Sequence, residues 1–189
     1  VNVISVDQIK PANPVETDGD RGTIDYFAAN ITDKPELQDV CAEVLKKYGR
    51  IDGLINSAAI DTRPDAPIEE KGPFENFPLD VWRKVIDVNV TGTFLCCQIF
   101  GKAMADQKKG SIINICSTYG LVSPDQKIYE YRRQQGEDFY KPPAYATSKS
   151  ALLNLTRYIA TYWGAKGVRT NTLTFGGVEN EQDEEFMQA

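Results

Sequence analysis

The chain has 189 residues, a length typical of one domain, and its 41% hydrophobic and 25% charged residues are ordinary for a globular protein. It contains no histidine, which excludes Ser-His-Asp hydrolysis and His-ligated zinc. The net charge of −6 arises mostly from an acidic C-terminal stretch, so the nearly neutral body lacks the basic surface of a nucleic-acid-binding protein.

Strand-like and helix-like patterns alternate along the chain. We expect strands at residues 1–6, 23–28, 51–55, 111–116 and 168–174, and helices at about 33–48, 79–106 and 144–163. Loops rich in Pro, Asn, Asp and Gly separate some of them, at residues 8–21 and 61–78. This alternation predicts an α/β fold, a Rossmann-type doubly wound parallel sheet in a single domain, with helices on both faces.

Both ends of the sequence suggest a piece of a longer protein. A strand begins directly at Val1, and the chain ends in the acidic stretch 179–189. We therefore expect a domain at residues 1–178 that is incomplete at both ends, followed by an acidic tail or the start of a substrate loop. No apolar run reaches the roughly 20 residues of a membrane span, so no membrane partner is expected.

Four cysteines without CxxC spacing indicate free thiols in a reducing, cytoplasmic environment. They are Cys41, Cys96, Cys97 and Cys116. Three of them lie in apolar stretches, where free cysteine behaves as a small hydrophobic residue.

Tyr145 and Lys149 occupy positions i and i+4 of the last predicted helix, so their side chains share one face. An ammonium group stabilises a neighbouring phenolate, and we expect Lys149 to lower the pKa of Tyr145. Ser117 follows a strand, at the end of an α/β sheet that binds ligands. Asn89 lies in an otherwise apolar helix, either within this site or as a polar side chain satisfied by a neighbouring backbone group.

These segments together resemble the short-chain dehydrogenase/reductase family over roughly residues 1–180. The segment 56–59, Asn-Ser-Ala-Ala, is similar to the family's NNAG segment, and 171–177 resembles its strand ending in Pro-Gly, with Phe175 in place of proline. Its Asn-Ser-Tyr-Lys tetrad is matched, in chain order, by Asn89, Ser117, Tyr145 and Lys149.

The resemblance implies an enzyme, a nicotinamide-dependent oxidoreductase that interconverts an alcohol and a ketone. Tyr145 would transfer the proton, and Ser117 would hold the substrate oxygen. Lys149 would bind the ribose hydroxyls, and Asn89 would hold a water molecule that links Lys149 to solvent. No metal site is expected.

The resemblance also implies a cofactor site at the ends of successive strands. Asp7 ends the first strand, where a carboxylate binds the adenosine ribose and repels a 2′-phosphate, so we expect NAD rather than NADP. An aspartate at this point is also common in turns. The other residues expected to contact the cofactor are Asn30, Ile31, Asn56, Ser57, Ala58, Tyr145, Lys149, Phe175, Gly176 and Val178.

The largest departure from the family pattern is the glycine-rich turn, since no GxxxGxG sequence occurs anywhere in the chain. The family strand that precedes this turn lies mid-sheet, between those matching residues 1–6 and 51–55. We therefore expect a gap in the sheet there. The alternative to an active enzyme is a non-catalytic or truncated relative that has lost cofactor binding.

A second departure is the spacing of Ser117 and Tyr145, which lie 28 residues apart, about twice the usual family distance. The extra segment within 123–143 is either a lid over the substrate or a solvated surface excursion. As a lid, it would use Arg132 and Arg133 to bind a carboxylate or phosphate, with Tyr119 beside Ser117 also contacting substrate. The segment resembles relatives of surface-sugar pathways, which favours a sugar or nucleotide-sugar substrate.

The helices at 79–106 and 144–163 carry more apolar side chains than one packing face requires. The additional residues are Phe94, Phe100, Met104, Leu152, Leu155, Tyr158 and Tyr162. The family resemblance implies a homodimer or homotetramer in which these helices pack against another copy. Coverage by other segments of the same protein is the alternative.

Overall fold

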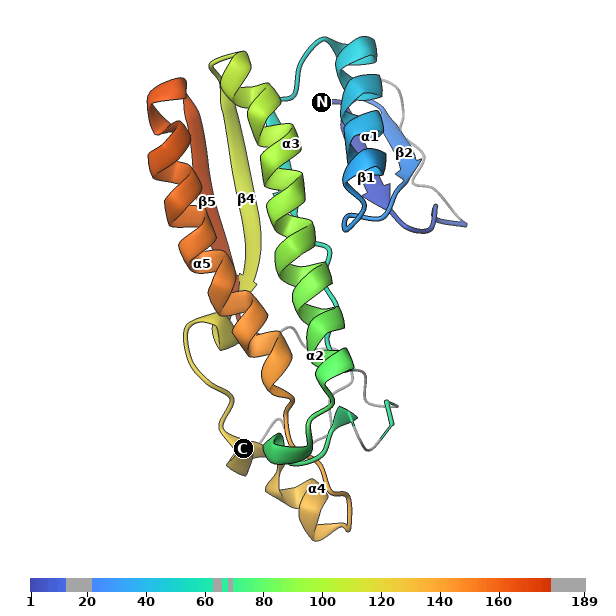
Figure 1. Ribbon diagram of the computed structural model, residues 1–189, viewed down its shortest axis with the longest axis vertical. Coiled ribbons are helices and arrows are strands. Elements are labelled where there is room, and N and C mark those ends of the chain that lie inside the picture. Colours follow the sequence, from blue (N-terminus) through green and yellow to red (C-terminus); the bar gives the residue numbers. More distant parts are fainter. Residues whose placement is uncertain (13–21, 63–65, 68–69, 178–189) are drawn as a thin grey trace.

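The computed structural model describes residues 1–12, 22–62, 66–67 and 70–177, whose five strands are all parallel (Figure 1). Strand β1 (Val3–Asp7) pairs with β2 (Ile24–Ala28). A second sheet has the order β3 (Gly53–Asn56), β4 (Gly110–Ser117), β5 (Val168–Phe175). Each strand lies within a residue or two of the range expected from the sequence, which confirms the parallel α/β reading.

The strands were expected in one sheet with a gap, and in the described residues they form two separate sheets. A cleft of about 820 Å³ separates them, lined by β1 on one side and by β3 on the other. The cleft lies where the sequence predicted a gap. With no strand between them, the facing edges of β1 and β3 pair with nothing in the described part of the chain.

The helices connect the strands, and α1 is the one whose ends are clearly marked by capping residues. Helix α1 (Lys34–Tyr48) starts after Asp33, whose carboxylate accepts a hydrogen bond of 3.0 Å from the Glu36 amide, and ends at Gly49 in the left-handed conformation. The other α-helices are α2 (Leu79–Ile86), α3 (Thr93–Asp106), α4 (Glu130–Gln134) and α5 (Pro143–Trp163). Short 3-10 turns occupy Phe74–Asn76, Thr118–Gly120, Gln126–Tyr129 and Gly164–Lys166.

Helices α2 and α3 belong to the predicted helix at 79–106, which contains a π-helical turn at Asp87–Gly92. Such turns often occur at functional sites. This one contains Asn89 and ends at Gly92, where a Cβ atom would lie 2.5 Å from Cδ1 of Ile31. The turn therefore packs directly against the segment that follows β2.

Among the described residues, helices cover one face of the β3–β4–β5 sheet, whereas the sequence suggested helices on both faces. The crossovers from β3 to β4 and from β4 to β5 step in the same direction, so right-handedness places α3 and α5 together, as Figure 1 shows. Burial alternates along β4 accordingly. On the opposite face Ile55 is 65% exposed and Leu173 43% exposed.

The hydrophobic core lies between α1, α3 and the sheet, with α5 closing its far side. It contains the buried thiols of Cys41, Cys96 and Cys97, and all four cysteines are free. Burial raises the pKa of the Cys96 and Cys97 thiols to about 12, so both stay protonated and packed. In the described ranges, no helix combines the length and apolar character needed to cross a bilayer.

Candidate active site

The strand ends bring the sequence-predicted residues to one edge of the molecule. Parallel register pairs Ser117 with Phe175 at the ends of β4 and β5, and Asn56 with Asn114 at the end of β3. Asp7 ends β1 beside Ala28 of β2. Because parallel strands all end at the same edge, these residues form the rim at which α/β sheets bind ligands.

Ser117 and Tyr145 meet because the end of β4 approaches α5 closely. The Cys116 thiol donates to the Lys149 carbonyl at 3.2 Å, and the Ser150 hydroxyl donates to the Gly120 carbonyl at 2.8 Å. Ser117 Oγ also accepts a hydrogen bond of 3.2 Å from the Tyr119 amide, which orients the Ser117 hydroxyl. The Ser117 side chain lies close enough to the Tyr145 phenol to lower its pKa, so the two hydroxyl groups belong to one site.

The pKa of Tyr145 is raised, which corrects the expectation that Lys149 lowers it. Partial burial is the main cause, since it disfavours the phenolate, and the Asp61 carboxylate raises the pKa further. The hydrogen bond from Ser117 opposes both effects. Without a ligand, Tyr145 is therefore held as the neutral phenol, the form that donates a proton.

Lys149 is 3% exposed, and its ammonium nitrogen lies 5.6 Å from the centre of the Tyr145 ring. Its Nζ donates to the Ile115 carbonyl at 2.9 Å rather than to the phenol. Burial lowers the pKa of Lys149, while the nearby Asp61 carboxylate opposes that shift. An ammonium group has three N–H donors, so this single contact leaves capacity for hydroxyl groups of a ligand.

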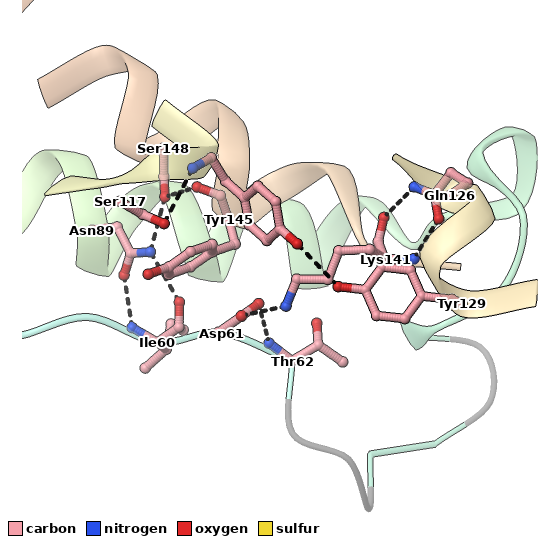
Figure 2. Close-up of polar contacts among 11 residues, drawn as sticks. Ile60, Asp61, Thr62, Asn89, Ser117, Gln126, Tyr129, Lys141, Tyr145 and Ser148 are labelled. Carbon is pink, nitrogen blue, oxygen red and sulfur yellow. Dashed lines mark hydrogen bonds and ion pairs between the residues drawn. The ribbon is translucent and has the colours of Figure 1, made fainter. Parts of the chain in front are cut away.

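Asn89 is 1% exposed, and its amide is fully used by protein groups. Its Oδ1 accepts from the Ile60 amide at 2.8 Å, and its Nδ2 donates to the Ile60 carbonyl and to the Ser148 hydroxyl, each at 2.9 Å. The side chain thus ties the segment after β3 to α5 (Figure 2). The side-chain amide is therefore satisfied by protein groups, and the role of Asn89 in the site stays a prediction.

A second buried amide network supports the strand ends. Asn56 donates to Asn114 at 2.8 Å, and Asn114 donates to Thr156 of α5 at the same distance. Asn114 is fully buried, and unpaired amides there would be costly. The network fixes β3 and β4 against α5, so it positions the strand ends that carry the site.

The remaining residues predicted to bind the cofactor differ in exposure. Asp7, Ser57, Ala58, Phe175 and Gly176 are exposed at the strand ends. Asn30 accepts hydrogen bonds of 3.0 Å from both the amide and the hydroxyl of Thr32. Ile31 is half-buried against Gly92. Val178 and the acidic stretch 179–189 lie outside the described residues.

Arg132 and Arg133 contact their own segment. Arg132 forms an ion pair of 3.0 Å with Glu137 and stacks on Phe139. Arg133 pairs with Glu130 at 2.7 Å and donates to the carbonyl groups of Gln126 and Phe139. Their prediction as substrate ligands remains untested, but both guanidinium groups already hold the 126–140 region in shape.

The structure adds two charged residues that the sequence analysis did not select. Asp61 and Lys141 form an ion pair of 2.5 Å next to Tyr145. Lys141 lies four residues before Tyr145, and Lys149 lies four residues after it. This spacing could have identified Lys141 as a neighbour of Tyr145. Nothing in the sequence pairs it with Asp61, which lies 80 positions away.

Known proteins with similar sequences are dehydrogenases and reductases. The sequence matches the protein family described as "Enoyl-(Acyl carrier protein) reductase" over residues 1–188. D-threitol dehydrogenase of Mycolicibacterium smegmatis is 32% identical over 156 residues, which are 82% of this chain and 51% of that protein. The 3-oxoacyl-(acyl-carrier-protein) reductase FabG of Thermotoga maritima is 30% identical over 174 residues, covering 92% of this chain and 61% of that protein.

A solved structure resembles the whole described fold. The short chain dehydrogenase of Leptospira borgpetersenii with bound NAD+ superposes with a TM-score of 0.80 at 28% identity, covering 98% of this chain and 65% of that chain. The present chain spans little more than half the length of the curated relatives that it matches.

Proposed function

The chain belongs to the short-chain dehydrogenase/reductase family, and on that premise we propose that it is a nicotinamide-dependent oxidoreductase that interconverts an alcohol and a ketone. The observation that carries the proposal is the convergence of Ser117, Tyr145 and Lys149 at the strand-end rim. These residues come from the end of β4 and the first turns of α5. They supply a hydrogen-bond donor, a proton donor and a cation around one point.

Tyr145 is the proposed acid–base. In ketone reduction its phenol gives the proton to the substrate oxygen, and in alcohol oxidation the phenolate takes it back. Ser117 donates a hydrogen bond to the same oxygen and fixes its distance from Tyr145. Lys149 stabilises the phenolate by its charge once a ligand draws its ammonium group away from the Ile115 carbonyl.

The residues of the rim fit part of a nicotinamide cofactor, which supplies or accepts the hydride when it is bound. Lys149, buried with spare N–H donors, fits the nicotinamide ribose. Asp7, exposed at the end of β1, fits the adenosine ribose and favours NAD over NADP. We assign the remaining contacts to Asn30, Ile31, Asn56, Ser57, Ala58, Phe175, Gly176 and Val178.

A second candidate function is the alternative that the sequence analysis left open. That candidate is a non-catalytic relative that keeps the tetrad but does not bind the cofactor. Titration with NAD, followed by protein fluorescence, separates the two. Saturable binding supports the enzyme, and the lack of it supports the second candidate.

The proposed substrate is a small sugar-like alcohol or a nucleotide sugar. Tyr119 and the 126–145 region place several polar side chains beside Tyr145, and a relative named D-threitol dehydrogenase points to polyols. We also propose that the protein acts in the reducing cytoplasm, since its four thiols are free, and that it forms a homodimer or homotetramer.

The substitution Tyr145→Phe, made in the full-length protein, tests the assignment of Tyr145 as the acid–base. It removes the phenolic proton and leaves the ring, so we expect kcat to fall by about 10²–10⁴-fold. The NAD dissociation constant should change little, as measured by fluorescence titration. The matched control is Tyr158→Phe, which changes a tyrosine 63% exposed on the same helix and should leave kcat unchanged. Full activity of Tyr145→Phe would refute the assignment.

A further inference from the structure

The ion pair of Asp61 and Lys141 lies beside Tyr145, the proposed acid–base. Its side chains are 33% and 14% exposed, respectively, so the pair is partly buried and still open to solvent. The Lys141 ammonium lies 5.5 Å from the centre of the Tyr145 ring. Figure 2 shows the pair between the segment carrying Ile60 and Thr62 and the region carrying Gln126 and Tyr129.

Backbone contacts on both sides hold the pair in place. Lys141 donates its amide to the Gln126 side chain at 2.9 Å and accepts from the same side chain at 3.1 Å. Asp61 directly follows Ile60, whose amide and carbonyl are both bound by Asn89. The Thr62 amide also donates to Asp61 at 2.8 Å. Two charged groups fixed this way before ligand binding form a pre-organised polar contact.

The chemistry of the pair selects for neutral, hydroxyl-bearing ligands. A carboxylate has about four acceptor positions and an ammonium has three donors, so both keep capacity beyond their mutual contact. A hydroxyl group donates to one and accepts from the other. An anion would face the Asp61 carboxylate, and the nearby Arg132 and Arg133 are already bound within their own segment. A cation would face the Lys141 and Lys149 ammonium groups.

We propose that Asp61 and Lys141 are specificity-determining residues that bind the hydroxyl next to the reacting carbon of a neutral polyhydroxy substrate. That hydroxyl donates to the Asp61 carboxylate and accepts from the Lys141 ammonium. The inference rests on the proposed function, because it needs the reacting oxygen to lie at Tyr145. It narrows the substrate to one whose reacting end is an uncharged vicinal diol or hydroxyketone.

The test compares two ligands that differ by this single hydroxyl. Ligand-observed NMR measures the dissociation constants of cyclohexane-1,2-diol and of cyclohexanol. The full-length protein is used, with NAD present. We expect Asp61→Asn and Lys141→Gln each to weaken diol binding by roughly tenfold, because each leaves a polar group with a poorer partner. Cyclohexanol binding should change by less than about twofold, the scatter of neutral substitutions.

The matched control is Asp106→Asn, which makes the same change in a lysine ion pair that is 64% exposed at the end of α3. It should alter neither dissociation constant. An anionic ligand, 2-hydroxycyclohexanecarboxylate, should bind Asp61→Asn more tightly than the unmodified protein, since the substitution removes the opposing carboxylate. If the Tm of Asp61→Asn shows that this variant does not fold, the diol and cyclohexanol dissociation constants of Lys141→Gln test the proposal.

The inference is overturned if both ligands weaken equally, if neither changes, or if the anion binds best to the unmodified protein. The proposed function fails in a different way. Its failure would appear as no turnover of either alcohol with NAD or NADP, even though the diol-specific loss of binding is observed.

Discussion

The ammonium groups of Lys141 and Lys149 lie 5.5 and 5.6 Å, respectively, from the centre of the Tyr145 ring. Neither ammonium group contributes to the shift in the pKa of Tyr145. Lys141 is paired with Asp61, and Lys149 donates to the Ile115 carbonyl. Burial and the Asp61 charge therefore determine the protonation of Tyr145. A ligand that engages Lys149 or Asp61 changes that balance at the point of reaction.

The pH dependence of alcohol oxidation gives a prediction for two substitutions of opposite sign. Oxidation needs the Tyr145 phenolate, so kcat/KM rises with pH through the pKa of Tyr145. Asp61 raises that pKa and the Ser117 hydrogen bond lowers it. We expect Asp61→Asn to move the rise in kcat/KM to lower pH and Ser117→Ala to move it to higher pH. Normalised pH–rate profiles measure both.

Ser117→Ala also lowers the maximum value of kcat/KM. The measured quantity is therefore the pH at which kcat/KM rises, not the maximum that it reaches. Asp106→Asn, remote from the site, serves as the control and should leave the profile in place. Shifts of both variants in the same direction would contradict the electrostatic account of Tyr145.

At the scale of elements, the site depends on the close approach of β4 to α5 at Gly120. A Cβ atom there would lie 2.4 Å from the Cys116 sulfur and 3.1 Å from backbone atoms of Lys149. We expect Gly120→Ala to push the end of β4 away from α5 and to destabilise the protein by about 1–3 kcal/mol. The same displacement should separate Ser117 from Tyr145 and lower kcat. Denaturant unfolding and steady-state kinetics measure the two effects.

Gly164→Ala is the control for that experiment. Gly164 follows α5 in a right-handed helical conformation, and nothing lies within 4 Å of an added Cβ atom. Alanine there should be neutral or slightly stabilising. If both glycine substitutions cost the same, close approach at Gly120 is not what holds the site together.

The sequence predicted the elements well where local chemistry defines them. Asp33 and Gly49 mark the ends of α1 because a side-chain cap and a left-handed turn are local features. The π-helical turn at Asp87–Gly92 was not predictable, since it preserves the helical pattern and shifts it by only one residue. The single covered face of the sheet was missed because a buried strand and a half-exposed one have similar apolar content, as Ile55 shows.

The site was predictable only in part for a related reason. Tyr145 and Lys149 share one helix, and a spacing of four residues reveals them. Ser117 is visible as a hydroxyl at a strand end. Asp61 meets Lys141 only through folding, and no periodicity links two loops that lie 80 positions apart. The hydrogen bonds between the Asn89 side chain and the Ile60 backbone could not be predicted for the same reason.

At the scale of the whole molecule, exposed aromatic side chains mark the outer faces of α3 and α5. Phe94 is 43% exposed, and Tyr158 and Tyr162 are 63% and 61% exposed. Three other residues assigned to this surface from the sequence, Phe100, Met104 and Leu152, are buried within the chain instead. The surface available to another copy is therefore smaller than the sequence suggested, and it is centred on the stacked pair Tyr158 and Tyr162.

We expect the unmodified protein to sediment as a dimer or larger assembly at micromolar concentration. The double substitution Tyr158→Ser with Tyr162→Ser should shift it towards the monomer, because it removes the largest exposed apolar area on α5. Analytical ultracentrifugation measures the change. Phe74→Ser, which removes a side chain 77% exposed outside these helices, is the control. A monomeric unmodified protein would contradict the oligomer.

The two sides of the cleft should differ in the free energy of local unfolding. No backbone hydrogen bonds of the described strands bridge β1 and β3, and packing of α1 on α3 joins the two halves. Local opening of β1, β2 and α1 therefore breaks fewer interactions than opening of β4, which is hydrogen-bonded on both sides. Amide hydrogens of β2 should exchange with deuterium well before those of β4. In a polypeptide of residues 1–189, the half that carries Asp7 would thus open before the half that carries Ser117, Tyr145 and Lys149.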